Sequence, residues 1–332
     1  MQEFETITAI ERIVIVGFIV LNMNDVRGVS NPNANSSYQK RKQDNHHKWL
    51  GTVLLSWGTF VFALFFATLV GSMASQAGAS KLLKQGIQAG LVTLITVPLL
   101  YILLKRMSSR PFYSIGLSGW RQAIPKAIMG AMYVIVLSGS GFAIAHLLGW
   151  IKVTQFHFSV HLVTALLLNM IIAFFYEAFP EELTFRGTVY YALNKRWNCF
   201  MALLLQPILF VLAPIIVSGL QYIAGIESPA ITLDYIVLLL TFGCILQLLR
   251  ILTGSLWTSI AFHLAFLENS RFFVLQGKER FITYEEIVPG TGALFVIFFM
   301  LLIVGTLLLI PVAITRRNAI QWRKNEKCDQ DV

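Results

Sequence analysis

The chain has 332 residues, of which 56% are hydrophobic and 13% are charged, and its mean hydropathy is +0.68. Soluble domains carry about 25% charged residues, so this composition excludes a soluble globular protein and predicts an integral membrane protein. The net charge of +9 is typical of cytoplasmic loops rich in Lys and Arg, so we expect membrane lipid, and no nucleic acid, among the partners.

The first 48 residues are more polar than the rest of the chain. Residues 13–21 are apolar, but this run is shorter than the roughly 20 residues that a span requires. No cleavage site follows it, so it is not predicted as a signal peptide. Met23 is an alternative start, which would remove residues 1–22; a surface-lying amphipathic segment is the other interpretation. Residues 24–48 are predicted to be poorly ordered, within a polar cytoplasmic tail over 1–48.

Eight apolar runs follow, each long enough to cross a membrane as a helix. They are 49–71, 86–104, 127–151, 160–180, 199–223, 231–252, 254–275 and 292–314. A backbone in lipid must satisfy its own hydrogen bonds, and these continuous runs favour helices over the alternating strands of a barrel. We therefore predict an all-α polytopic bundle of about eight transmembrane helices over 49–314, followed by a basic cytoplasmic tail over 315–332.

The positions of Lys and Arg predict the orientation of this bundle. They are concentrated in the N-terminal tail, in the loop between the second and third runs, and after residue 314, which places both termini in the cytoplasm. On this topology the fourth run ends near the cytoplasmic side, at Glu181. His263 lies nine residues past Gly254, or about 13 Å deep in the seventh run. Glu181 and His263 can therefore lie in the cytoplasmic half of one cavity.

An ionisable cluster stands at the end of the fourth run, where a charge at membrane depth indicates a functional site. Glu182 and Arg186 are four residues apart, so they share a helical face and can pair. Glu181 points about 100° away from Glu182 and is left unpaired, free to take a proton from water. Glu177, one turn earlier, is an auxiliary candidate. Pro180 is expected to kink the helix. An ion network that closes the helix end is the alternative interpretation.

Two segments resemble motifs of the CPBP family, which comprises CAAX prenyl proteases and bacteriocin-processing enzymes and is also called the Abi family. Residues 179–187, Phe-Pro-Glu-Glu-Leu-Thr-Phe-Arg-Gly, resemble its first motif, and residues 254–263 resemble the approach to its last motif, which centres on a histidine. The resemblance covers about 86–275. It implies an intramembrane cavity in which a water activated by Glu181 attacks a peptide bond, with Arg186 as organiser and His263 stabilising the oxyanion.

The sequence departs from the family pattern at two positions. The second motif is Phe-x-x-x-His, and the matching stretch 210–214 ends in Pro214. The final motif has a small polar or acidic residue four positions after its histidine, where this chain has Leu267. Glu268 and Asn269 follow, about 140° and 240° around the helix from His263, and are auxiliary candidates.

We expect no metal or other cofactor at this site. One histidine and one carboxylate fall short of the three protein ligands of a catalytic zinc site. His157 and His161 are four residues apart, which is metal-ligand spacing on a helix, but they stand at the opposite end of the fourth run from Glu181. We interpret them as interfacial histidines.

The remaining polar side chains of the apolar runs are predicted to hold helices together. Glu268 and Arg271 are three residues apart and are expected to pair with each other. Asn169, Gln206 and Gln247 are expected to form hydrogen bonds between helices.

Three functions are weighed on these observations. The first is a CPBP-like intramembrane endopeptidase that acts on a leader-bearing peptide or a membrane protein in a bacterial plasma membrane. The second is an inactive member of the same fold that binds and regulates such a partner, which Pro214 and Leu267 favour. The third is a transporter, which the sequence disfavours because it has no repeated broken-helix pattern.

Overall fold

The computed structural model describes residues 35–228 and 230–316. The chain divides into two units, one made of residues 1–42 and 325–332 and the other of 43–324. The elements below lie in the second unit, apart from the first residues of α2. The apolar run at 13–21, the alternative start at Met23 and most of the basic C-terminal tail lie outside the described residues.

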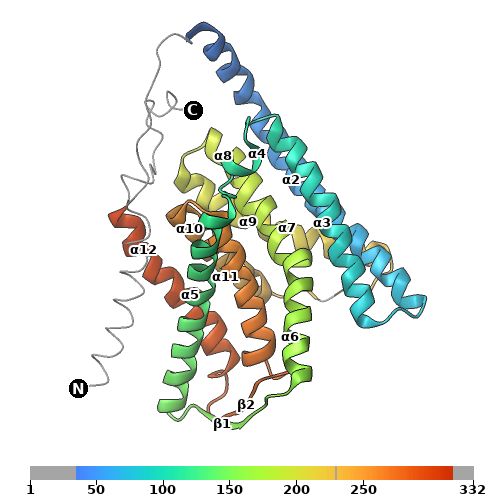
Figure 1. Cartoon of the computed structure of the whole chain (residues 1–332), viewed down its shortest axis with the longest axis vertical. Helices are drawn as coiled ribbons and strands as arrows, with labels where there is room; N and C mark the ends of the chain where they lie inside the picture. The colour runs from blue at the N-terminus through green and yellow to red at the C-terminus, as the bar shows by residue number, and fades with distance from the viewer. Residues whose placement is uncertain (1–34, 229, 317–332) are drawn as a thin grey trace. The chain divides into compact units, whose positions relative to one another are not determined.

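Over its described residues, the second unit is made of helices and one pair of short strands (Figure 1). Elements labelled η are π-helical. The elements in chain order are α2 (Asn35–Gln76), α3 (Lys81–Lys105), α4 (Pro111–Ser114), α5 (Trp120–Leu147), β1 (Ile151–Phe156), α6 (Val160–Ala173), η1 (Phe174–Ala178), α7 (Phe179–Glu182), η2 (Leu183–Val189), α8 (Tyr190–Arg196), α9 (Cys199–Ile223), α10 (Leu233–Thr253), α11 (Leu256–Asn269), η3 (Ser270–Val274), β2 (Ile282–Glu286), η4 (Leu294–Val304) and α12 (Gly305–Thr315).

The predicted all-helical membrane fold is confirmed. Within the described residues, 7 helices are long and apolar enough to cross a membrane, and they correspond to seven of the eight predicted runs. The remaining run, 254–275, forms α11 and η3, which carry His263, Glu268 and Arg271. α11 tolerates this polarity because it packs mainly on α5 and touches α10 and α6, so its polar side chains face other helices.

The helix that carries the ionisable cluster is continuous from Val160 to Arg196. Ser159 caps its start by accepting a hydrogen bond from the Leu162 amide. Pro180 removes one backbone donor, and the Phe179 amide just before it bonds the Phe174 carbonyl, five residues back. The π-helical turns η1 and η2 on either side of α7 thus carry the chain through the proline, and such turns are frequent at functional sites.

A close approach of backbones brings α11 against α5. A Cβ on Gly130 would stand 2.2 Å from the Thr258 carbonyl oxygen, so only glycine fits there. Gly254 ends α10 with a φ of 66°, a left-handed conformation that glycine adopts without strain. The turn there lets the chain reverse into α11, and the Leu256 amide donates to the Gly116 carbonyl. These contacts fix the height and rotation of the helix that carries His263.

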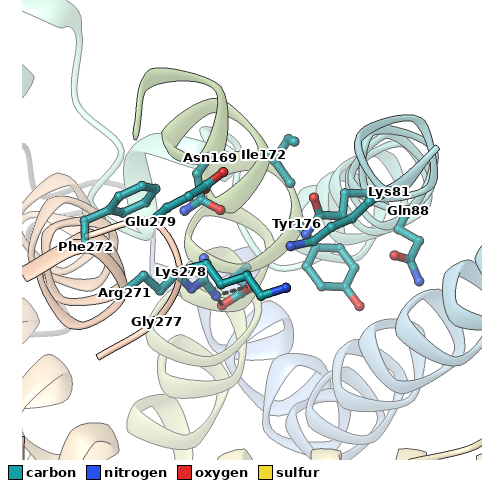
Figure 2. Close-up of a pocket in the computed structure, with 12 residues that line it drawn as sticks. Lys81, Gln88, Asn169, Ile172, Tyr176, Arg271, Phe272, Gly277, Lys278 and Glu279 are labelled. Carbon is teal, nitrogen blue, oxygen red and sulfur yellow. Dashed lines mark hydrogen bonds and ion pairs between the residues drawn. The ribbon is translucent and has the colours of Figure 1, made fainter. Parts of the chain in front are cut away.

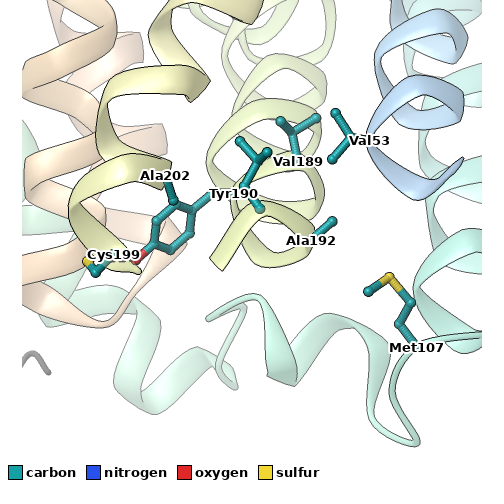
Figure 3. Close-up of a cluster of buried hydrophobic side chains, with 8 residues drawn as sticks. Val53, Met107, Val189, Tyr190, Ala192, Cys199 and Ala202 are labelled. Carbon is teal, nitrogen blue, oxygen red and sulfur yellow. Dashed lines mark hydrogen bonds between the residues drawn. The ribbon is translucent and has the colours of Figure 1, made fainter. Parts of the chain in front are cut away.

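A buried apolar cluster packs the start of α9 against α8 and α2 (Figure 3). It contains Val53, Val189 and Ala202. Cys199 lies in the same cluster as a free thiol, and its Sγ is 3.2 Å from the Tyr190 hydroxyl. The cluster anchors the end of the long helix one turn beyond Arg186.

Two features differ from the sequence-based expectations. α2 begins at Asn35, inside the tail predicted to be poorly ordered, because no proline or glycine between 35 and 48 interrupts the helix. The strands β1 and β2 were not predicted. They pair antiparallel from Ile151↔Glu286 to Phe156↔Ile282, with an irregularity between Val153 and Gln155, and lie at the end of the bundle where α5 stops and α6 begins (Figure 1).

Candidate active site

The predicted pairing of Glu182 with Arg186 is present. Arg186 Nη1 lies 3.0 Å from Glu182 Oε1, and both side chains are fully buried. The four-residue spacing holds across the α7–η2 junction, so the two groups share one face. Two opposite charges this deeply buried neutralise each other, whereas either one alone would be costly.

His263 reaches the same carboxylate from α11. Its Nδ1 lies 3.1 Å from Glu182 Oε1, and because a carboxylate paired with Arg186 can only accept, Nδ1–H is the donor. The ring of Phe242, from α10, stands edge-on to the imidazole with centroids 4.8 Å apart. Glu182 and Phe242 therefore fix the orientation of His263 and leave Nε2 as its free ring nitrogen.

Glu181 faces that free nitrogen. Its Oε2 lies 4.0 Å from His263 Nε2, and its side chain is 18% exposed, against 3% for His263 and 0% for Glu182. The sequence predicts that Glu181 is the unpaired carboxylate and that it can meet His263, and the structure brings the two together. Glu181 is thus the least buried of these three side chains.

Several polar atoms around this cluster have no hydrogen-bond partner in the described part of the chain. They include Glu182 Oε2 and all three guanidinium nitrogens of Arg186. The Arg186 guanidinium is held by the ion pair with Glu182 and by the face of Phe210, whose ring centroid is 4.2 Å from Cζ. Buried donors of this kind are available to a polar ligand.

A comparison with known protein families bears on this geometry. Residues 162–266 match the family model described as Type II CAAX prenyl endopeptidase Rce1-like. This segment is a CPBP-family domain. The match spans Glu181, Glu182, Arg186 and His263, and it confirms the resemblance predicted from the sequence. No curated protein and no solved structure matches the chain.

The auxiliary candidates Glu177, Glu268 and Asn269 do not join the cluster as a set. Arg271 Nη2 donates to both oxygens of Glu177, at 2.7 and 2.9 Å. The predicted pair of Glu268 with Arg271 is therefore wrong. Glu268 instead accepts a hydrogen bond of 2.7 Å from Asn169. The helix is π-helical from Ser270 onward, so the three-residue spacing assumed for an α-helix does not hold there.

Asn269 is tied to a different helix. Its Oδ1 accepts a hydrogen bond of 2.9 Å from Ser138 of α5. The bond from Asn169 to Glu268 confirms Asn169 as a bridge between helices. Gln206 and Gln247 are buried, but their side-chain atoms have no partner among the described residues, so the bridging role predicted for these two is wrong.

The two departures from the family motifs have different surroundings. Pro214 lies within α9, one turn beyond Phe210, and offers no side-chain ligand. Leu267 is half-buried in α11, one turn beyond His263.

Phe210 is the retained residue of the second motif, and its contact with Arg186 was not predicted from the sequence. The motif itself was the signal, because an aromatic ring next to a buried guanidinium offers it a π face.

The donor set of the site does not fit a catalytic zinc ion, which takes three protein ligands. Nδ1 of His263 is engaged by Glu182, which is itself paired with Arg186. Nε2 and the Glu181 carboxylate are the two donors that remain. In the described ranges, no group of three or more His, Cys, Asp or Glu side chains could hold a metal ion. His157 Nε2 lies 2.8 Å from Thr283 Oγ1 instead.

Proposed function

We propose that the protein is an intramembrane endopeptidase in which Glu181 activates a water molecule. The observation that carries this proposal is the asymmetry of the two neighbouring glutamates. Glu182 is fully buried and paired, while Glu181 is partly exposed and 4.0 Å from His263 Nε2. A general base needs access to water and freedom from a permanent ion pair, and Glu181 meets both needs.

The proposed reaction follows from these positions. Glu181 removes a proton from water, and the resulting hydroxide attacks the carbonyl carbon of the substrate peptide. In its imidazolium form, with Nδ1–H still bonded to Glu182, His263 donates from Nε2–H to the carbonyl oxygen as it becomes an oxyanion. The C–N bond then breaks, and Glu181 returns its proton to the leaving amine. Glu182 and Arg186 act as positioning residues, because they hold His263 through Nδ1.

The proposal is tested by cleavage of peptides by the purified protein in detergent. A panel of peptides, each with an apolar segment next to a polar flank, is incubated with the protein and analysed by mass spectrometry. We expect cleavage by the wild-type protein and by Glu285→Gln, which changes an exposed carboxylate on β2. We expect no cleavage by Glu181→Gln. Equal cleavage by Glu181→Gln and the wild-type protein would contradict the proposal.

A second candidate is an inactive domain that binds a peptide or membrane protein and regulates it. Pro214 and Leu267 favour this function, since the family motifs place polar side chains at both positions. The two candidates differ in how they respond to Glu181→Gln in cells. Loss of the cellular phenotype in a stably folded Glu181→Gln protein supports the peptidase, whereas full retention supports the scaffold.

We also propose that the protein lies in a bacterial plasma membrane with both termini in the cytoplasm. The distribution of Lys and Arg supports this orientation. Single cysteines introduced at Lys105 and at Lys152, on opposite sides in this topology, provide the test. A membrane-impermeant thiol reagent added to intact cells should label the cysteine at 152 and not the one at 105, and the reverse result would contradict the orientation.

A further inference from the structure

A cavity of about 510 Å³ is bounded by the start of α3, the end of α6, η1, η3 and the loop after η3 (Figure 2). This volume falls within the roughly 300–1,000 Å³ of pockets that hold small ligands. Glu177 and Tyr176 form part of its wall. Glu181, the carboxylate proposed as the base, follows Glu177 by four residues along the same helix and does not itself line the cavity.

Three cations line this cavity. Lys81 and Lys278 are exposed at its mouth, and neither has an acidic partner among residues 35–228 and 230–316. Arg271 is deeper and uses Nη2 for its bond to Glu177, so its Nη1 and Nε donors remain available. Glu177 is neutralised by that bond, which leaves Glu279 as the acidic side chain opposing the two lysines.

Amide side chains supply the remaining polar wall. Gln85 and Gln88 come from α3, and Asn169 comes from α6. Amides of this kind donate to and accept from a peptide backbone. The cavity therefore combines an excess of positive charge with groups that suit an extended peptide, and its wall includes Glu177, four residues before the proposed catalytic glutamate.

We infer that this cavity binds an acidic segment of a peptide substrate, with Lys81, Lys278 and the free donors of Arg271 contacting its carboxylates. The inference rests on the proposed function, in that it assigns the flank of the chain that the peptidase would cut. It also implies that Glu279 weakens binding, because this carboxylate repels the carboxylates of the same peptide.

The test is binding of short peptides with an uncharged BODIPY label to the full-length protein in an uncharged detergent, followed by fluorescence anisotropy. Three peptides of equal length are compared, with adjacent Asp-Asp, Asn-Asn or Lys-Lys at the centre. Each is measured on the wild-type protein and on Glu181→Gln, so that cleavage does not remove the probe. We expect the Asp-Asp peptide to bind about tenfold more tightly than the Asn-Asn peptide, as two or three partly exposed ion pairs allow.

Variants of the cavity give changes of opposite sign. The double variant Lys81→Glu/Lys278→Glu should weaken binding of the Asp-Asp peptide about tenfold or more, and Glu279→Gln should strengthen it about two- to threefold. Lys152→Glu, on β1 and away from the cavity, is the matched control and should leave binding unchanged. The inference is overturned if these substitutions leave the affinity for the Asp-Asp peptide unchanged, or if the Asp-Asp and Asn-Asn peptides bind equally.

Two further results separate the possible explanations. Charge-dependent binding without cleavage of any peptide would refute the peptidase and support the cavity as a recognition site. Cleavage without charge preference would support the peptidase and overturn the inference. Tight binding of short-chain phosphatidylglycerol, with no binding of the Asp-Asp peptide, would assign the cavity to lipid headgroups and also overturn it.

Discussion

Two glutamates of the long helix from Val160 to Arg196 form ion pairs in different environments. Glu182 pairs with Arg186 inside the bundle, where both side chains are fully buried. Glu177 pairs with Arg271 at the cavity, where the side chains are 25% and 36% exposed. The exposed pair has the shorter contact, 2.7 Å against 3.0 Å. Burial, and not distance, determines how much stability is lost when one partner is removed. Solvent compensates the loss of a partner in the second pair and cannot do so in the first.

Removing the arginine of the buried pair should have the largest effect on stability. Arg186→Met leaves the Glu182 carboxylate buried without its counter-charge, so we expect a loss of about 3–5 kcal/mol in the free energy of unfolding. Unfolding in mixed micelles with increasing denaturing detergent provides the measurement. The double variant Glu182→Leu/Arg186→Met should recover much of the loss, because no unpaired charge remains. A loss under about 1 kcal/mol for Arg186→Met would show that solvent reaches the pair.

The close approach of α5 and α11 supports the buried pair, because it places His263 against Glu182. Gly130→Ala puts a Cβ 2.2 Å from the Thr258 carbonyl oxygen, so the helices must separate, at a cost of about 1–3 kcal/mol. Gly141→Ala, also on α5, meets the flexible side chain of Met300 at 3.1 Å and is the matched control. We expect Gly130→Ala to reduce stability and peptide cleavage together and Gly141→Ala to leave cleavage intact. Equal effects of the two would contradict this packing.

The exposed pair should give the smallest effect. Arg271→Met removes a partner from a carboxylate that is 25% exposed, so we expect a loss of at most about 1 kcal/mol. The same unfolding assay, repeated at high salt, checks the cause, because screening should shrink the difference from the wild-type protein. A loss of stability as large as that of Arg186→Met would mean that water does not reach the Glu177 carboxylate.

Much of the helical fold and the meeting of Glu181 with His263 could be predicted from the sequence. Continuous apolar runs mark helices in lipid, and four-residue spacing places Glu182 with Arg186 on one face. The partners of Glu268 and Arg271 could not be predicted, because η1 and η3 change the number of residues per turn. Gln206 and Gln247 were predicted to form hydrogen bonds between helices from their residue type alone. Whether a buried amide finds a partner depends on how the neighbouring helices are rotated.

The central claim is that Glu181 exchanges protons in the reaction, whereas the adjacent Glu182 positions His263. The most direct measurement compares cleavage and unfolding for Glu181→Gln with the wild-type protein. We predict that the cleavage rate falls by about 10²–10⁴-fold, while the free energy of unfolding changes by less than about 1 kcal/mol, since Glu181 is partly exposed and makes no short ion pair. A Glu181→Gln protein that retains the wild-type cleavage rate, or that loses activity only because it unfolds, would contradict the account.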